Sequence, residues 1–189
     1  QVVSIMTNTG FGTANFDRWD DVSRGLILLL MFVGGCAGST SCSIKVIRHV
    51  LLGKVLRQEV EKVYRPRVVR PIRLGGRVLD DPDVRNHVLT YFSTFALIFA
   101  LGWLVLVTVE PDSTWSGARS NDKLIDCASA VAATLNGVGP GLGVVGESEN
   151  YAHFHAASKM TLTVLMLLGR LEIFVLLVLV TPGFWRSPL

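Results

Sequence analysis

The chain has 189 residues, half of them hydrophobic, and a formal net charge of +3 at pH 7. Its mean hydropathy of +0.45 is too high for an ordinary soluble domain, so the composition indicates an integral membrane protein. Three cysteines at unrelated spacings exclude a disulfide framework and a zinc-binding pattern. No initiator methionine or signal peptide opens the chain, and we therefore expect the interior of a longer polypeptide.

Three apolar segments follow one another along the chain. Residues 25–44 are strongly apolar only in their first half, because the second half, GGCAGSTSCS, consists of small residues. Residues 88–109 carry no charge and are long enough, at about 1.5 Å per residue, to cross a bilayer core of about 30 Å. Residues 160–180 are similarly long but carry Arg170 and Glu172 near the middle. The pattern predicts two full membrane spans and one broken span.

The basic residues predict the orientation of these spans. Eleven of the 18 lysines and arginines lie between Lys45 and Arg85, whereas Glu110 to His153 holds only two, with six acidic residues. The basic loop should therefore face the cytoplasm and the acidic stretch should face outward. This topology closes only if residues 128–143 enter and leave on the outer face, as a re-entrant loop.

The basic loop is expected to have structure of its own. Residues 44–63 keep apolar residues at helical spacing, and VVRPIRLGGRVLDDPDV is typical of a short hairpin that turns at Gly75–Gly76. Asp81 and Pro82 are a plausible helix start. No aromatic residues alternate with the basic ones, so we expect no nucleic-acid partner and interpret the charges as marking the inner face.

Residues 130–146, AVAATLNGVGPGLGVVG, place five glycines inside an apolar stretch. Gly141, Gly143 and Gly146 match the dinucleotide-binding pattern G-x-G-x-x-G. That pattern also requires a preceding strand and an acidic residue about 20 positions later. Nothing upstream predicts a strand, and the later position is Thr161 in an apolar helix. We therefore regard the match as accidental.

The same stretch has a counterpart near the start of the chain. Thr7-Asn8-Thr9-Gly10-Phe11 aligns with Asn136-Gly137-Val138-Gly139-Pro140, and each follows an apolar, pore-helix-like run. Glycine can direct successive carbonyls to one side, and rings of such carbonyls replace the hydration shell of an ion. A Gly-Pro turn in an outer loop is the alternative, and the repetition at matching positions argues against it.

Six further stretches carry a family resemblance: SIMTNTGFGTA, MFVGGCAGST, IKVIRHVLL, RPIRLGGRV, ATLNGVGPGLG and LLGRLEIF with LVLVTPGFWR. Together they resemble the C-terminal portion of the TrkH subunits of bacterial Trk potassium uptake systems, in the Trk/Ktr/HKT superfamily. The resemblance implies an all-α integral membrane protein with M1–pore loop–M2 repeats as in potassium channels. Re-entrant pore helices and an interrupted transmembrane helix are implied with it.

The resemblance divides the chain into three parts. Residues 1–63 would be the end of the third repeat, with its filter strand, broken M2 helix and cytoplasmic extension. Residues 64–83 would be a cytoplasmic linker with a short hairpin, and residues 84–189 the complete fourth repeat.

The resemblance also assigns site residues. The filter would comprise Thr7, Asn8, Thr9, Gly10, Phe11, Asn136, Gly137, Val138, Gly139 and Pro140. Potassium would be bound at Asn8, Thr9, Gly137 and Val138. The gate would be an intramembrane loop with two basic residues, namely Gly34, Gly35, Cys36, Ala37, Gly38, Ser39, Thr40, Lys45 and Arg170. Family members usually carry a glycine run where this chain has Ser41-Cys42-Ser43, which bears on the flexibility of the loop.

Arg170 is also notable on physical grounds. An arginine in the middle of a span costs about 2.5–3.5 kcal/mol on insertion scales, so an unpaired position facing lipid is not expected. A pore-facing arginine that opposes cation passage is the functional interpretation. A salt bridge within the bundle is the alternative, although Glu172 points to a different helix face.

The sequence gives little support to other function classes. No Ser-His-Asp cluster, HExxH, CxxC pair or P-loop lysine occurs, so we do not expect an enzyme. His153 and His155 have no further ligands near them in sequence, so we expect no zinc site there. A sodium or mixed sodium/potassium pore of the same superfamily is the alternative, although the filter glycines favour potassium.

The resemblance further implies a multi-pass protein in the bacterial inner membrane, in contact with membrane lipid. A homodimer and a cytoplasmic ring of nucleotide-binding TrkA-type regulatory subunits are implied as partners. No cofactor is implied, because potassium is the transported and bound ion.

Overall fold

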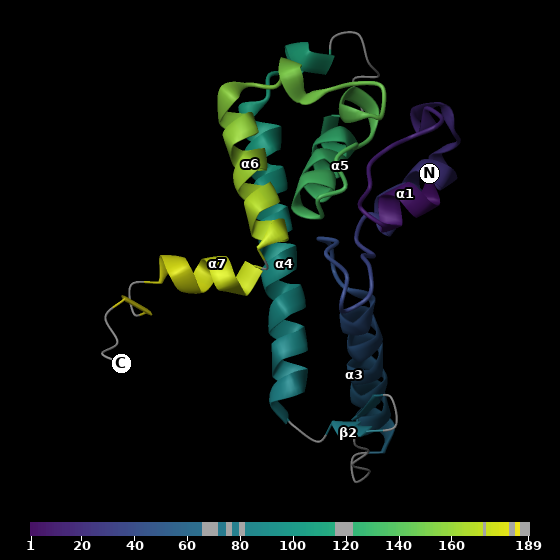
Figure 1. Cartoon of the computed structure of the whole chain (residues 1–189), viewed down its shortest axis with the longest axis vertical. Helices are drawn as coiled ribbons and strands as arrows, with labels where there is room; N and C mark the ends of the chain where they lie inside the picture. Colours follow the sequence, from purple (N-terminus) through teal and green to yellow (C-terminus); the bar gives the residue numbers. More distant parts are fainter. Residues whose placement is uncertain are drawn as a thin grey trace.

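The computed structural model describes residues 1–65, 72–74, 77–79, 82–115, 123–171, 173–181 and 184–185. These residues form helices, short 3-10 turns and one two-stranded hairpin (Figure 1). In chain order the elements are α1 (Val2–Met6), η1 (Phe16–Arg18), α2 (Asp21–Leu30), α3 (Val46–Tyr64), β1 (Ile72–Leu74), β2 (Arg77–Leu79), α4 (Pro82–Val109), η2 (Asp112–Trp115), α5 (Lys123–Leu135), η3 (Gly143–Val145), η4 (Tyr151–His153), α6 (Ala156–Arg170) and α7 (Ile173–Val180).

Helix α4 forms the long axis of the molecule (Figure 1). It begins at Pro82, where proline suits the first helical turn, and ends just before Glu110 and Pro111. Its residues Val84–Val109 are the one single helix of the described chain that is long and apolar enough to cross a membrane. The predicted helix over 88–109 is therefore confirmed, as is its start at Pro82.

The first apolar segment is interrupted as the sequence predicts. Helix α2 ends at Leu30 and α3 begins at Val46, and the fifteen residues between them contain no helix. Val33 and Ile44 form a parallel β-bridge, and the Gly34 amide donates to the Ile44 carbonyl at 3.0 Å. The interruption is thus a closed loop that leaves and returns at nearly one point. Helix α3 confirms the helical spacing expected over residues 44–63.

The expectation of one continuous span over residues 160–180 is wrong. Helices α6 and α7 are separate and bent by 109° relative to each other, and only together would they have the length of a span. In Figure 1, α7 projects sideways from the lower end of α6. Arg170 ends α6, and its guanidinium donates to the Thr40 carbonyl in the loop that follows α2.

Strands β1 and β2 pair antiparallel, with Leu74 opposite Arg77. This register is that of a β-hairpin in which β1 and β2 are the two arms. The expected turn residues Gly75–Gly76, and Asp81 before α4, lie outside the described residues.

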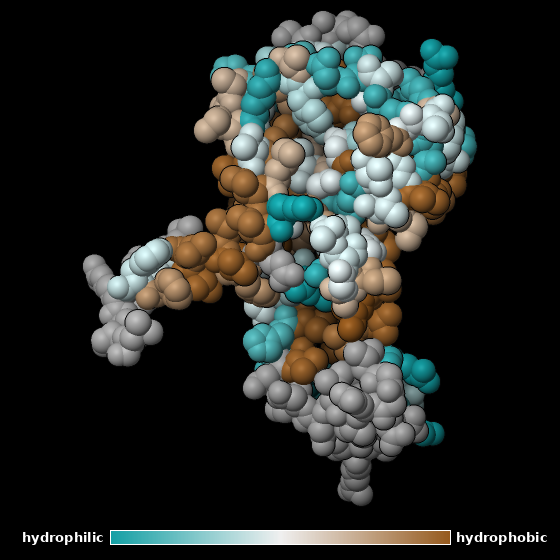
Figure 2. Space-filling view, in the orientation of Figure 1, coloured by the Kyte–Doolittle hydropathy of each residue, from teal (hydrophilic) through white to brown (hydrophobic). Residues whose placement is uncertain are grey.

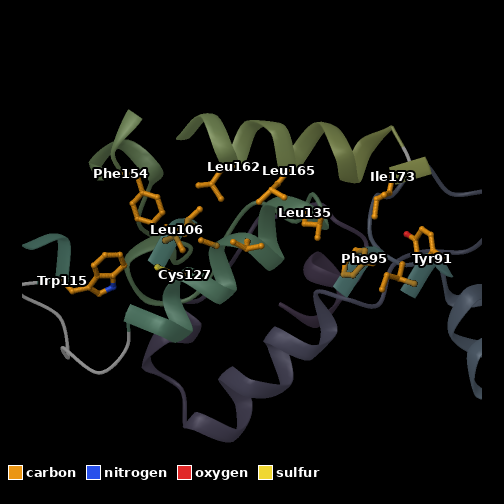
Figure 3. Packing of buried hydrophobic residues seen from close by; sticks show 14 residues of the cluster. Tyr91, Phe95, Leu106, Trp115, Cys127, Leu135, Phe154, Leu162, Leu165 and Ile173 are labelled. Carbon is orange, nitrogen blue, oxygen red and sulfur yellow. The ribbon is translucent and has the colours of Figure 1, made fainter. Parts of the chain in front are cut away.

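The core lies where α5 and α6 pack against the upper half of α4 (Figure 1). Most of α5 is buried, and its small residues, such as Cys127 and Ala130, let the neighbouring helices approach closely. Figure 3 shows the larger side chains that fill the space between the helices. Those labelled are Tyr91, Phe95, Leu106, Trp115, Cys127, Leu135, Phe154, Leu162, Leu165 and Ile173.

The outer faces of the long helices are apolar. Leu97, Leu101 and Leu104 of α4 and Met166 and Leu167 of α6 are exposed. Figure 2 shows hydrophobic residues along α7 and the middle of the long axis, while hydrophilic residues gather at the upper end. Such extended apolar surface requires lipid or further protein against it.

Candidate functional site

Two turns with the same backbone geometry follow α1 and α5. After α1, the Thr9 amide donates to the Ser4 carbonyl at 2.9 Å. After α5, the Val138 amide donates to the Ala133 carbonyl at 2.8 Å. In both bonds the acceptor lies five residues before the donor, near the C-terminal end of the preceding helix, as in helix C-terminal capping motifs.

The backbone angles of the two turns match as well. Asn8 and Gly137 have φ of 56° and 64°, and Gly10 and Gly139 have φ of 75° and 104°. Positive φ favours glycine strongly. The similarity seen between the two sequences is therefore a similarity of backbone conformation.

The structure brings these two turns together. The side-chain amide of Asn8 donates to the Asn136 carbonyl. A Cβ atom at Gly10 would overlap the Val138 carbonyl oxygen and lie 3.3 Å from Cδ of Pro140. Predicted filter residues that are 128 positions apart in the chain thus lie in contact.

The site is rich in hydrogen-bond acceptors and poor in donors. Among the described residues, no hydrogen bond reaches the carbonyl oxygens of four residues: Asn8, Thr9, Gly137 and Val138. The side-chain oxygens of Asn8 and Asn136 are also buried without a donor in this part of the chain. Val138 is buried, Asn8 and Gly137 are half-buried and Thr9 is exposed. Carbonyl oxygens that accept no hydrogen bond from the protein are able to coordinate a cation.

The loop between α2 and α3 lies directly against this site. A Cβ at Gly137 would lie 2.7 Å from the Cys42 sulfur. Hydroxyl groups hold the loop in shape, because Ser41 accepts the Gly35 amide at 2.9 Å and Ser43 donates to the Met31 carbonyl at 3.0 Å. The Ser41-Cys42-Ser43 stretch therefore stiffens the loop where a glycine run would not.

Two basic residues hold the same loop. Arg170 donates through Nη1 to the Thr40 carbonyl at 2.8 Å, with the Cys42 sulfur 3.8 Å from the same nitrogen. Lys45 donates through Nζ to the Ala37 carbonyl at 3.2 Å. Both side chains belong to a cavity of about 290 Å³ between the loop and α6. Its lining comprises Ser39, Thr40, Ser41, Cys42, Ser43, Lys45, Arg48, Tyr91, Gly169, Arg170 and Ile173.

The remaining predicted site residues are more peripheral. The Phe11 side chain is 82% exposed, and Cys36, Ala37 and Gly38 form the exposed tip of the loop. His155 caps α6, with its ring nitrogen Nδ1 accepting the Ala157 amide at 3.3 Å.

Glu110, at the end of α4, is a structural residue that the sequence analysis missed. Its backbone carbonyl accepts Lys123 Nζ at 2.8 Å, and its Oε1 accepts the His155 amide at 2.9 Å. Lys123 starts α5 and His155 precedes α6. The segment from Lys123 to His155 therefore begins and ends beside the same residue, Glu110, at the end of α4. The sequence signal that could have identified Glu110 is its position as a single carboxylate directly after the uncharged residues 88–109.

We expect Glu110→Ala to lower the stability of the protein by about 1–3 kcal/mol, because the His155 amide loses its acceptor in a partly buried hydrogen bond. Glu110 is only 2% exposed, so water does not replace the bond freely. Thermal unfolding of the purified intact protein measures the effect. Glu110→Gln, which keeps an oxygen acceptor, is the matched control and should unfold close to the parent. An alanine variant as stable as the glutamine variant would contradict this role.

A family model described as "TrkH: Cation transport protein" matches residues 1–186. The chain belongs to the TrkH family. It is 40% identical over 187 residues to the Trk system potassium uptake protein TrkH of Salmonella typhimurium and 42% identical to that of Vibrio parahaemolyticus. Each match covers 99% of this chain and 36% of the relative, so the chain spans about a third of the relatives' length.

A solved structure agrees. The crystal structure of the potassium transporter TrkH from Vibrio parahaemolyticus superimposes with a TM-score of 0.80 at 42% identity. It matches 97% of this chain, which covers 36% of that structure.

These comparisons confirm several expectations. The TrkH family resemblance is correct, and the relatives are named as potassium uptake proteins or a potassium transporter, not as enzymes. The helical architecture is also that of the solved relative. The finer expectation that the chain is the C-terminal portion of a family member is not supported by them.

Proposed function

We propose that this chain is part of the pore-forming subunit of a Trk-type potassium uptake system in the bacterial inner membrane. The observation that carries the proposal is the pair of adjoining turns whose carbonyls at Asn8, Thr9, Gly137 and Val138 accept no hydrogen bond among the described residues. Main-chain oxygens in this arrangement can replace the hydration shell of K⁺. Relatives named potassium uptake proteins support K⁺ as the ion.

In this proposal, residues 1–63 close one M1–pore–M2 repeat, residues 64–83 link it to the next, and residues 84–189 form that next repeat. Helix α5 and the turn after it are re-entrant. The contacts of Lys123 and His155 with Glu110 support this, since both ends of the segment lie at the same end of α4. Other repeats of the intact subunit complete the pore wall, because non-helical backbone at membrane depth must be covered by protein or line a water-filled cavity.

The loop over residues 34–45 is proposed to be the gate. It lies against Gly137 and is held by Arg170 and Lys45. Two positive charges next to the turn that binds the ion oppose the passage of a cation. Release of Arg170 from the Thr40 carbonyl would free the loop to move.

The partners are proposed from the family. A homodimer and a cytoplasmic ring of TrkA-type nucleotide-binding subunits would complete the system. The basic surface of α3, which includes exposed Arg57 next to Lys54, is suited to an acidic partner on the cytoplasmic side.

The test is growth of a bacterial strain that lacks potassium uptake systems, complemented with the complete gene that encodes this chain. We expect growth at low K⁺ and uptake of K⁺ that excess Na⁺ does not reduce. Equal competition by Na⁺ would instead establish the mixed sodium/potassium pore. Absence of rescue, with the protein present in the membrane, would refute both.

A further inference from the structure

The carbonyl oxygen of Gly139 is held by a side chain. The hydroxyl of Tyr151, in η4, donates to it at 2.8 Å. Tyr151 lies twelve residues further along the chain, beyond η3. Burial raises the pKa of this hydroxyl, which therefore remains a protonated donor.

Packing does not fix the backbone at Gly139. A Cβ atom built there would meet no described heavy atom within 4 Å, although φ is 104°. The Gly139 amide makes one long hydrogen bond, of 3.4 Å, to the Ala133 carbonyl. The tyrosine hydroxyl is thus the strongest described restraint on this residue.

The matching turn after α1 is held differently. Gly10 abuts the Val138 carbonyl and Pro140, so packing restrains it. The residue twelve positions after Gly10 is Val22, whose side chain has no hydrogen-bond donor and is 81% exposed. The two turns therefore differ in how their corresponding glycines are restrained: packing restrains Gly10, whereas the Tyr151 hydroxyl restrains Gly139.

Tyr151 is itself held in place. Its ring lies edge-on to Phe154 with centroids 5.8 Å apart, and Phe154 lies 6.2 Å from the ring of Trp115. The Trp115 indole donates to Asp126, in the first turn of α5, at 3.0 Å. The tyrosine is therefore connected through aromatic rings to the start of the helix whose end carries Gly137 and Gly139.

Open space lies beside the turn. A mainly apolar cavity of about 290 Å³ is bordered by Gly137, Gly139, Tyr151 and Met166. Without the hydroxyl, the peptide units around Gly139 would be free to rotate toward this space, because glycine tolerates many backbone angles.

We propose that Tyr151 is a positioning residue of the ion site, and that its hydroxyl sets selectivity for K⁺ over smaller cations by fixing the backbone at Gly139. The proposal rests on the potassium-pore function proposed above. A carbonyl oxygen has two lone pairs, so a bond from Tyr151 leaves Gly139 able to face an ion as well. The adjacent Val138 carbonyl is oriented through the same glycine.

The test is Tyr151→Phe in the complete subunit, which removes one oxygen atom and keeps the ring contacts. Uptake of K⁺ and of Na⁺ is measured in the same transport-deficient cells at matched protein amounts. We expect the K⁺/Na⁺ uptake ratio to fall roughly three- to tenfold, the effect of one lost hydrogen bond. Tyr64→Phe is the matched control, because Tyr64 ends α3 far from the site and is exposed.

The outcomes are distinct. If the parent and Tyr64→Phe take up no K⁺, the potassium-pore function itself fails. If both transport K⁺ normally and Tyr151→Phe keeps their ratio, or loses K⁺ and Na⁺ uptake equally, the positioning role is overturned. Thermal unfolding of the purified variants checks that a changed ratio does not arise from lost stability.

Discussion

Gly10→Ala is expected to reduce potassium uptake more than tenfold. Gly10 has φ of 75°, which costs an L-residue about 1–2 kcal/mol. The added methyl group would also overlap the Val138 carbonyl oxygen, a backbone atom of the opposing turn that no rotamer change can move aside. Overpacking of this kind costs about 1–3 kcal/mol more. Together these terms displace both turns and the carbonyls proposed to bind the ion.

Two further substitutions make the test specific, with K⁺ uptake measured at matched membrane protein amounts. Gly139→Ala has unfavourable φ but open space around its Cβ, so we expect a smaller loss than for Gly10→Ala. Gly53→Ala, within α3, has normal φ and no neighbour within 4 Å, and should transport like the parent. Equal uptake by Gly10→Ala and Gly53→Ala would exclude close contact between the two turns in the working protein.

Arg170→Ala is expected to raise potassium uptake roughly tenfold. A unit charge at about 4 Å opposes a passing cation by about 4 kcal/mol at an effective dielectric constant of about 20, and by less at greater distance. The substitution also removes the hydrogen bond to the Thr40 carbonyl and so frees the loop. Both effects act in the same direction.

Arg170→Lys is the matched control, because it keeps the charge and one donor. Initial K⁺ uptake rates in the complemented strain should remain within about twofold of the parent, since the Coulomb term is unchanged. If Arg170→Ala transports at or below the parent rate at equal expression, the arginine does not restrict the pore.

Local sequence patterns predicted the elements that are set by local chemistry. The uncharged run before Glu110 predicted α4, the helical spacing after Ile44 predicted α3, and the small residues from Gly34 onward predicted the loop. Each depends on neighbours within a few turns.

The sequence did not reveal the contacts made between distant residues. Glu110 meets His155 45 positions away, and Arg170 meets Thr40 130 positions away. Contacts between residues so far apart produce no periodic pattern in the sequence. The contact of Arg170 with the loop was expected only because of the family resemblance. The bend between α6 and α7 was also not predicted, although Gly169 stands one residue before the end of α6.

In the site, the sequence predicted two equivalent turns, and their backbone angles agree. It did not predict that one turn would carry a tyrosine bond and the other a close packing contact. The difference arises because Gly10 faces Val138 whereas Gly139 faces open space.

The Cys42 side chain leaves no room between Gly137 and the loop that joins α2 and α3. A displacement of the loop therefore removes one wall of the turn that is proposed to bind the ion. Thermodynamic reciprocity then requires that an ion bound there restrain the loop by the same factor by which loop movement weakens ion binding. On this basis, depletion of K⁺ would loosen the loop.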